Sequence, residues 1–529
     1  MNKGRTIFSD ATVIDGTGSP RFRGDLWVQA GRVVEIAPVA ETHPAGWEVI
    51  PVGGKVVAPG FIDVHSHADN AAFLPDPDLS KICQGVTTEV TGNCGESLAP
   101  RTEAFMTDLA EYTERLFPPT VWRGQGFAEF WDQAEARGLM TNVAPLVGQG
   151  TLRILAMGLE ERRASDAERR LMRDALRRAL DEGAFGLSTG LIYPPGVFTT
   201  TDEIIDLASC LDGRIYATHM RNESDLLVES VQEALTIGKE SGCRVQISHH
   251  KASGPQNWGK TTTTLELVME ARQAGQDVRL DVYPYTASST VLTSCLPPWV
   301  EAGGQEAVLR RLQDSGERRR IYDDIEKGLP GWENEFGHMG SDVILISSTR
   351  DHRYEGRTLT EVAQELHVDP IAAMMRLLVE NELRVSMILF SMDESDLRRV
   401  MTFPWTMIGS DGLPPGSGGK PHPRLFGTFP RVLGQYVRDE EWMNLETAVY
   451  KMTGLPADTF GLSDRGVIRP GAVADLVIFD SEAIEDMGRY AADAALPEGI
   501  KAVYLQGECV VEQGRYLGAK RGQRLKPMA

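Results

Sequence analysis

Short apolar runs alternate with amphipathic stretches from about residue 58 to 460, and this alternation restricts the fold more than any other feature of the chain. We expect buried strands at 143–147, 214–218, 244–248, 278–282, 342–346 and 406–409. Apolar residues in 164–180 and 226–241 recur at i, i+3 and i+4, the spacing of helices that pack against a sheet. Repeated β-then-α units over this length predict a (β/α)₈ barrel of the TIM type.

Both ends of the chain instead carry β-type runs separated by turns. Near the N-terminus these runs are 7–14, 26–29 and 32–36, and near the C-terminus they are 466–468, 475–479 and 502–505. Two such groups could pair into one unit, so we expect a small β-sandwich domain from residues 1–57 and 462–529 beside a catalytic barrel at 58–461. The charged, helical stretch at about 296–340 is expected to be an insertion near the barrel mouth.

The net charge of -21 and the pI of about 5.0 argue against nucleic acid and anionic membranes as partners. Both of those partners attract basic surfaces. No run of roughly 18 apolar residues is present, and the N-terminal residues lack the apolar core of a signal peptide. Six cysteines without a CxxC pair do not form a disulfide framework. We therefore expect a soluble, cytoplasmic protein that acts on a small molecule.

Residues able to bind a metal follow the predicted strands. His65 and His67, in GFIDVHSHADN, end the first barrel strand two positions apart, so both imidazoles project to the same side. The other candidates, each at the end of a later run, are Cys94, His219, the pair His249-His250, and Asp411. In a barrel of this type, catalytic groups lie at the C-terminal ends of the strands.

Imidazole, thiolate and carboxylate together are the ligands of a catalytic zinc, which keeps one position open for water. A single histidine at a strand end is more often structural, and a lone buried cysteine is usually inert. Six such residues at successive strand ends, in chain order, are hard to obtain by chance. The pattern therefore predicts a metal centre at the barrel mouth.

An HxH motif at strand one, two later histidines and an aspartate at strand eight resemble the amidohydrolase superfamily. Many two-metal members, such as dihydroorotases and hydantoinases, bridge their metals with a carbamylated lysine near strand four. This chain has no lysine between Lys81 and Lys239, which argues against that branch. A narrower resemblance, over essentially the whole chain, is to the N-acyl-D-amino acid deacylases (D-aminoacylases). It is carried by GNCG (92–95), FGLSTGLIYPPG (185–196), DVYPYTASST (281–290), GSDGLP (409–414) and HPRLFGTFPRVLG (422–434).

The resemblance implies a ligand set. One tightly held zinc would be bound by Cys94, His219 and His249, and a second, weaker metal position would be formed by His65 and His67. His249 is preferred over His250 because the family pattern is a strand-end Ser-His followed shortly by Lys, and the neighbouring histidine could support the ligand instead.

Asp411 is placed to accept a proton from water and pass it to the departing amine, although an Asp-Gly after a strand could also be a helix N-cap. The carboxylate of an N-acyl amino acid needs cationic or hydroxyl partners, and Arg424 offers a planar fork for one. The family's other candidates are Lys251, Tyr283 and Ser289. Each of these four residues could instead be an ordinary surface or packing residue.

The implied activity is zinc-dependent hydrolysis of N-acyl-D-amino acids to a carboxylate and a free D-amino acid. Family members specific for acidic D-residues use an arginine shortly after the YPY segment, and no arginine occurs between Ser288 and Arg310. We therefore expect neutral, often hydrophobic, D-residues, although a distant arginine could fold into the pocket. The D stereochemistry follows from the resemblance alone.

Three alternatives stay open at this point. The first is another amidohydrolase-superfamily enzyme that cleaves cyclic amides or dipeptides. The second is an inactive barrel that only binds a ligand, and the third is a deaminase. A deaminase would carry a His-x-x-Glu pattern, which does not occur around His249.

Overall fold

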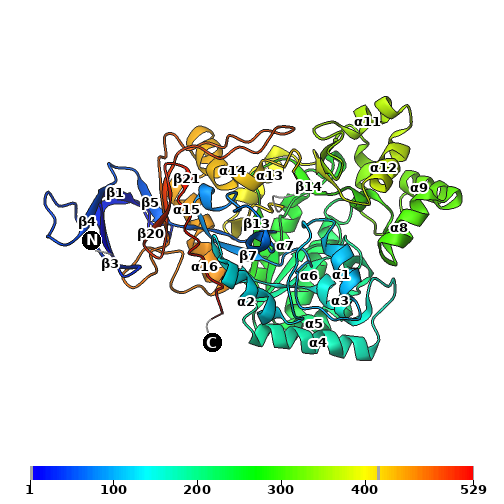
Figure 1. Cartoon of the computed structure of the whole chain (residues 1–529), viewed down its shortest axis with the longest axis horizontal. Coiled ribbons are helices and arrows are strands. Elements are labelled where there is room, and N and C mark those ends of the chain that lie inside the picture. Colours follow the sequence, from blue (N-terminus) through cyan, green and yellow to red (C-terminus); the bar gives the residue numbers. More distant parts are fainter. Residues whose placement is uncertain (1–3, 414–417, 528–529) are drawn as a thin grey trace.

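The computed structural model describes residues 4–413 and 418–527, so Pro414 of the GSDGLP motif lies outside the described residues. The middle of the chain forms a closed parallel barrel, as predicted (Figure 1). Its strands are β6 (Phe61–Asp63), β7 (Val86–Thr91), β8 (Asn142–Pro145), β10 (Gly186–Gly190), β11 (Ile215–His219), β12 (Arg244–Ile247), β13 (Val278–Val282) and β17 (Thr406–Ile408). The short β9 (Val147–Gly148) continues β8 and pairs with β10, and a parallel bridge between Ser66 and Gly412 joins the last strand to the first.

Helices cover the outside of the barrel where the 3.6-residue period predicts them. Helix α4 (Asp166–Asp181) buries Met172, Leu176, Ala179 and Leu180 on one face. Its start is defined by a capping box, in which Ser165 Oγ accepts from the amide of Glu168. Helix α6 (Leu227–Ser241) ends at Gly242, whose φ of 72° suits a glycine at a helix C-terminus. No helix within the described ranges is long and apolar enough to cross a membrane.

Strands from both chain ends pair into one sheet beside the barrel (Figure 1). The N-terminal strands are β1 (Arg5–Val13), β2 (Phe22–Gln29), β3 (Arg32–Ala37), β4 (Glu48–Pro51) and β5 (Val56–Pro59). The C-terminal strands are β18 (Leu476–Phe479), β19 (Ile500–Leu505), β20 (Glu508–Glu512) and β21 (Arg515–Tyr516). The two groups meet where β5 runs antiparallel to β18, with Val57 opposite Ile478.

A large insertion lies between β13 and β17, at the end of the molecule away from the small β domain (Figure 1). It holds an antiparallel sheet of β14 (Ser288–Val291), β16 (Val385–Leu389) and β15 (Ile344–Thr349). Its helices are α8 (Gly304–Gln313), α9 (Ser315–Lys327), α10 (Glu335–Met339), α11 (Leu359–Leu366) and α12 (Pro370–Glu380). These elements share a hydrophobic core that includes Leu296, Ile325 and Leu378.

The insertion is therefore longer than the expected helical stretch at 296–340, and it contains strands as well as helices. The expected strand at 342–346 overlaps β15, which belongs to this antiparallel sheet and not to the barrel. A short apolar run has the same local pattern in either sheet, because hydrophobic periodicity does not report the pairing partner.

Candidate functional site

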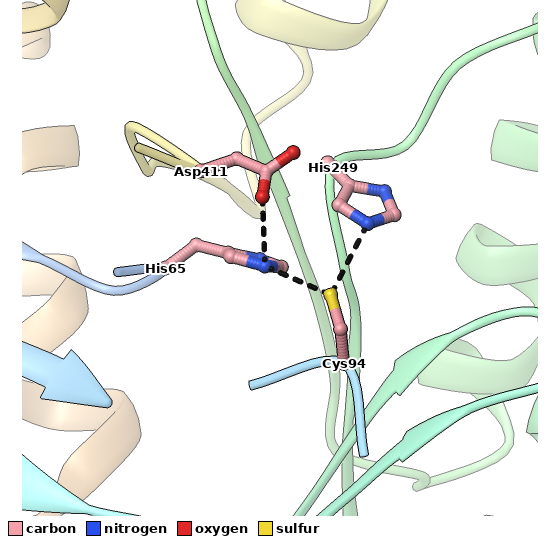
Figure 2. Close-up of side chains that lie close together, drawn as sticks. All are labelled: His65, Cys94, His249 and Asp411. Atoms are coloured by element: carbon pink, nitrogen blue, oxygen red, sulfur yellow. Dashed lines mark hydrogen bonds and ion pairs between the residues drawn. The ribbon is translucent and has the colours of Figure 1, made fainter. Parts of the chain in front are cut away.

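Four side chains from distant parts of the chain meet at the C-terminal ends of the barrel strands. His65 Nε2 lies 3.2 Å from Cys94 Sγ and 3.4 Å from Asp411 Oδ1. On its other side, Cys94 Sγ lies 3.6 Å from His249 Nε2 (Figure 2). All four residues are buried, and their potential ligand atoms lie within 4.8 Å of one another, which is close enough to share a metal ion.

A second group of potential ligands adjoins the first and shares His249 with it. It consists of His219, Glu223 and His249. The His219 and His249 rings make an edge-to-face contact with centroids 4.4 Å apart. His219 is only 5% exposed, and neither of its ring nitrogens has a hydrogen-bond partner in the described part of the chain. Buried polar atoms normally have partners, so this imidazole has the environment of a metal ligand.

His67 completes the set of predicted metal ligands, because its Nε2 lies 3.2 Å from Asp411 Oδ1. The structure also separates the two adjacent histidines. His250 Nε2 is 2.8 Å from Thr264 Oγ1 on the outer helix α7 (Thr261–Gln273), away from the cluster. The structure thus brings His249 and not His250 to Cys94.

The chain reaches the site through tight backbone turns. Cys94, His249 and Asp411 have positive φ values of 52°, 34° and 48°, which are uncommon for residues other than glycine. Hydrogen bonds donated by backbone amides support two of these turns. The amide of His249 donates to Asp281 Oδ1 at 2.9 Å, and the amide of Asp411 donates to the His65 carbonyl at 2.8 Å. Strained backbone of this kind occurs preferentially at functional sites.

Two carboxylates orient the imidazoles. Asp281 Oδ1 lies 3.2 Å from His65 Nδ1, and Glu223 Oε1 lies 3.0 Å from His249 Nδ1. Each contact occupies Nδ1 and leaves Nε2 directed toward Cys94, an arrangement typical of metal-binding histidines. No pattern in the sequence predicts this role for either residue, although Asp281 begins DVYPYTASST and Glu223 lies four positions after His219.

Burial determines the protonation of three potential ligands, His219, His249 and Cys94. It lowers the pKa of His219 and of His249 well below the usual value, so both are neutral imidazoles near pH 7 and can bind a metal. Burial also raises the pKa of the Cys94 thiol, and the negative charge of Asp411 raises it further. A thiolate at this position therefore requires a cation beside it.

The direction of the pKa shift of Asp411 is set by neighbouring groups and not by burial. Burial raises the pKa of its carboxyl group, but the charge of Arg424, that of His65 and a hydrogen bond with His67 more than offset that effect and hold the pKa well below its usual value. Arg424 is 1% exposed, and its Nη1 lies 2.8 Å from Asp411 Oδ2. Asp411 is therefore ionised near pH 7 and can accept a proton.

Comparison with known proteins decides the family. A family model described as "Amidohydrolase family" matches residues 48–511. This chain belongs to the amidohydrolase family. Within the family it lies in the D-aminoacylase branch, which confirms the resemblance inferred from its motifs.

Two relatives from Alcaligenes xylosoxydans xylosoxydans are similar to this amidohydrolase over nearly its whole length. An N-acyl-D-aspartate deacylase is 40% identical over 98% of this chain and 95% of its own length. A D-aminoacylase is 39% identical over 98% of this chain and 97% of its own length. The crystal structure of an N-acyl-D-glutamate deacylase from Bordetella bronchiseptica, complexed with zinc and a phosphonate mimic of the tetrahedral intermediate, matches with a TM-score of 0.82. It is 37% identical to this chain and covers 99% of it and 100% of the other chain.

A pocket adjoins the potential metal ligands His65, His67, Cys94, His219, His249 and Asp411, which together form the metal-ligand cluster. Three of the four predicted carboxylate binders, Lys251, Tyr283 and Ser289, line it together with Cys94, His219, His249 and Asp411. The fourth, Arg424, instead lines an adjoining cavity that shares Ser289, and its Nη2 donates to the Ser289 carbonyl at 2.8 Å. Lys251 Nζ donates to Glu223 Oε2 and lies 2.9 Å from His249 Nδ1. Lys251 and Arg424 thus each already contact a carboxylate, Glu223 and Asp411 respectively.

Proposed function

We propose that this amidohydrolase uses a bound metal to hydrolyse the amide bond of N-acyl-D-amino acids, releasing a carboxylate and a free D-amino acid. The observation that carries the proposal is the position of Cys94 Sγ between His65 Nε2 and His249 Nε2 at the base of the pocket. A cysteine thus occupies the centre of the ligand cluster, in a chain whose sequence lacks a lysine where the lysine-bridged amidohydrolases carry theirs.

The residues present fit a zinc ion. Cys94, His219 and His249 would hold it tightly, and His65 and His67 would form a second, weaker position that shares the cluster. His249 belongs to both ligand groups, with Cys94 in one of them and His219 in the other, so it can join these two residues at one metal ion. The ring nitrogens of His219, which have no hydrogen-bond partner among the described residues, support its role as a ligand. When bound, zinc lowers the pKa of a coordinated water toward roughly 7 and polarises the substrate carbonyl.

Asp411 would move the proton. Its ionised carboxylate faces His65 and His67 through Oδ1, at the edge of the metal-ligand cluster, where it can accept a proton from water. The departing amine must leave protonated, and the same carboxyl group can supply that proton. Arg424 holds the second oxygen of Asp411 and keeps the carboxylate in the ionised form.

Substrate binding would use Lys251, Tyr283 and Ser289 for the α-carboxylate, because all three line the pocket. An arginine from a distant segment does reach the pocket, since Arg115 lines it, but its Nη1 is ion-paired with Glu301. An acidic substrate side chain would have to compete with that carboxylate. This pairing supports the expected preference for neutral over acidic D-residues.

The six cysteines also support the predicted cytoplasmic location. Each is a free thiol in the structure, as expected for a reducing compartment.

The test is an assay of the zinc-loaded protein against N-acetyl-D- and N-acetyl-L-amino acid pairs, with free amine as the readout. Neutral side chains (Met, Leu, Phe) and acidic ones (Asp, Glu) should both be included. We expect turnover of neutral D compounds only, and its loss in Cys94→Ala and Asp411→Asn but not in Cys210→Ala. If no D compound is hydrolysed, the proposal is wrong, and cyclic amides and dipeptides are the next substrates to assay.

A further inference from the structure

The pocket above the metal-ligand cluster contains more acidic than basic side chains. Its lining includes the carboxylates Glu96, Glu223, Glu301, Glu333, Glu335 and Asp411, but as lysine or arginine only Lys251 and Arg115. All six carboxylates lie outside the barrel strands, and Glu301, Glu333 and Glu335 belong to the insertion between β13 and β17. The insertion thus supplies half of the acidic side chains that line the pocket.

Only three of these six carboxylates form ion pairs with lysine or arginine in the part of the chain that the structure describes. Lys251 pairs with Glu223, Arg115 pairs with Glu301, and Arg424 pairs with Asp411. Glu96, Glu333 and Glu335 form no ion pair within the ranges that the structure describes.

The three remaining carboxylates differ in their contacts. Glu96 bonds to the Tyr112 hydroxyl, and Glu333 Oε2 accepts a hydrogen bond from the backbone amide of Glu223. Glu335 is 8% exposed and lines the pocket, yet its carboxylate has no hydrogen bond or ion pair with any described residue. Because this carboxylate faces the pocket and its hydrogen-bonding capacity is not used by the protein, it is available to a ligand in the pocket.

Local contacts hold Glu335 in this position. It is the first residue of α10, and its amide donates to the Glu333 carbonyl at 3.0 Å. The preceding Asn334 anchors the turn, because its Nδ2 donates to the Ile325 carbonyl at 2.7 Å and its Oδ1 accepts from the Gly337 amide at 2.9 Å. The Glu335 carboxylate is therefore preorganised rather than carried on a free loop.

The contacts also connect Glu335 to the reacting end of the pocket. Glu335 follows Glu333, Glu333 contacts the Glu223 backbone, and the Glu223 side chain contacts both His249 and Lys251. A ligand that reaches Glu335 would therefore extend from the metal-ligand cluster along one continuous wall of the pocket.

Given the proposed deacylase function, on which this inference rests, we propose that the pocket selects substrates carrying a positively charged group, an alkylammonium or a guanidinium, and that Glu335 binds that group. Such a group forms a charge-assisted hydrogen bond with a carboxylate, which is stronger than a neutral one. The pocket would then not only exclude substrates with acidic groups but also favour substrates with basic groups.

Two parts of a substrate could carry the charge. One is the side chain of a basic D-amino acid such as D-lysine. The other is the free α-ammonium of an aminoacyl group that replaces the simple acyl group. Burial, with a smaller contribution from Glu223, raises the pKa of Glu335 to about 7. A cation beside it would favour the ionised form, so either source would be held more tightly above that pH than below it.

The test compares N-acetyl-D-lysine with N-acetyl-D-norleucine, which has the same carbon chain without the ammonium, on the zinc-loaded full-length enzyme. Glycyl-D-norleucine is the third substrate and places the ammonium on the acyl side. The variants are Glu335→Gln, Glu335→Asp, which keeps the charge, and the control Glu306→Gln, which changes an exposed carboxylate on α8 of the same insertion.

We expect the wild-type enzyme to favour one ammonium-bearing substrate over N-acetyl-D-norleucine by about tenfold or more in kcat/KM. Glu335→Gln should bring that ratio close to one, while Glu335→Asp retains part of it and Glu306→Gln retains all of it. Which ammonium substrate is favoured identifies the source of the charge.

Equal kcat/KM for all three substrates in the wild-type enzyme, or a preference that survives Glu335→Gln, would overturn the cation site and leave the deacylase function intact. Calorimetric binding of the same compounds separates the opposite case. If no compound is hydrolysed but N-acetyl-D-lysine binds more tightly than N-acetyl-D-norleucine only when Glu335 is present, the cation site stands and the deacylase function falls. The wild-type comparison remains decisive even if Glu335→Gln does not fold.

Discussion

Cys94 Sγ lies 3.6 Å from His249 Nε2, although 155 positions separate the two residues in the chain. Both residues follow barrel strands, and both turn into the site through a positive φ. The contact joins the second strand of the barrel to the sixth across its mouth. It therefore depends on closure of the whole barrel.

Removal of the thiolate should release the tightly held metal. We expect Cys94→Ala to lose zinc on dialysis against a mild chelator under conditions where the wild-type protein keeps it, and to lose at least about 100-fold in kcat/KM. Elemental analysis of the dialysed proteins measures the metal content. Cys210→Ala, which changes a partly exposed cysteine after helix α5 (Thr201–Ala208), is the matched control. Unchanged zinc content in Cys94→Ala would show that Cys94 is not a ligand.

The contact between Asp281 and His65 should affect metal affinity without direct ligation. Asp281→Asn weakens the acceptor of His65 Nδ1, so we expect zinc affinity or activity to fall by about 10- to 100-fold. Zinc titration with a competing chromophoric chelator measures the affinity. Asp277→Asn, just before β13 and about 38% exposed at its side chain, should behave as the wild-type protein. Equal affinities in the two variants would contradict the orienting role.

Arg424→Met should shift the pH dependence of activity. Arg424 holds the pKa of Asp411 below its usual range, and Asp411 must be ionised to accept a proton. Loss of the arginine raises that pKa, so the acidic limb of the kcat/KM profile should move to higher pH by about one unit or more. A rise in KM without a shift of the limb would instead assign Arg424 to the substrate carboxylate.

Ionisation of Glu89 should make the folded barrel less stable above pH 7 than at pH 5. This residue of β7 is buried, with Oε2 2.6 Å from Ser66 Oγ and Oε1 2.5 Å from Thr141 Oγ1. Burial raises the pKa of its carboxyl group to about 7. Between the unfolded pKa, near 4.3, and about 7, the folded state binds more protons than the unfolded state. The free energy of unfolding therefore falls as the pH rises through that window.

Glu89→Gln removes this titration. We expect the variant to gain stability relative to the wild-type protein from pH 5 to pH 8, by up to about 3 kcal/mol. Urea unfolding at both pH values measures the difference. A difference that does not change with pH would show that Glu89 does not titrate in this range.

Local sequence predicted which side chains lie together at the barrel mouth. The HxH pair, Cys94, His219, His249 and Asp411 were predicted from their positions after strand-like runs, and the structure brings all of them to one place. These residues lie together because barrel topology sends the C-terminal ends of all its strands to the same face.

Contacts between distant segments were not predictable in the same way. Asp281 and Glu223 orient the histidines, but a carboxylate at a strand end has the same local pattern whether it contacts an imidazole or solvent. The extent of the insertion was missed for a similar reason, since β15 resembles a barrel strand in hydrophobicity and length.

Residue type and local spacing were therefore enough to predict the barrel, the kinds of side chain at its mouth and the family. The folded structure was needed to show that His249 and not His250 faces Cys94, that Arg424 contacts Asp411, and that Glu335 lines the pocket without a hydrogen bond or ion pair to a described residue. These relationships join segments tens to hundreds of residues apart. Their physical basis is the packing of the closed barrel and of the insertion beside its mouth, which hydrophobic periodicity along the chain does not encode.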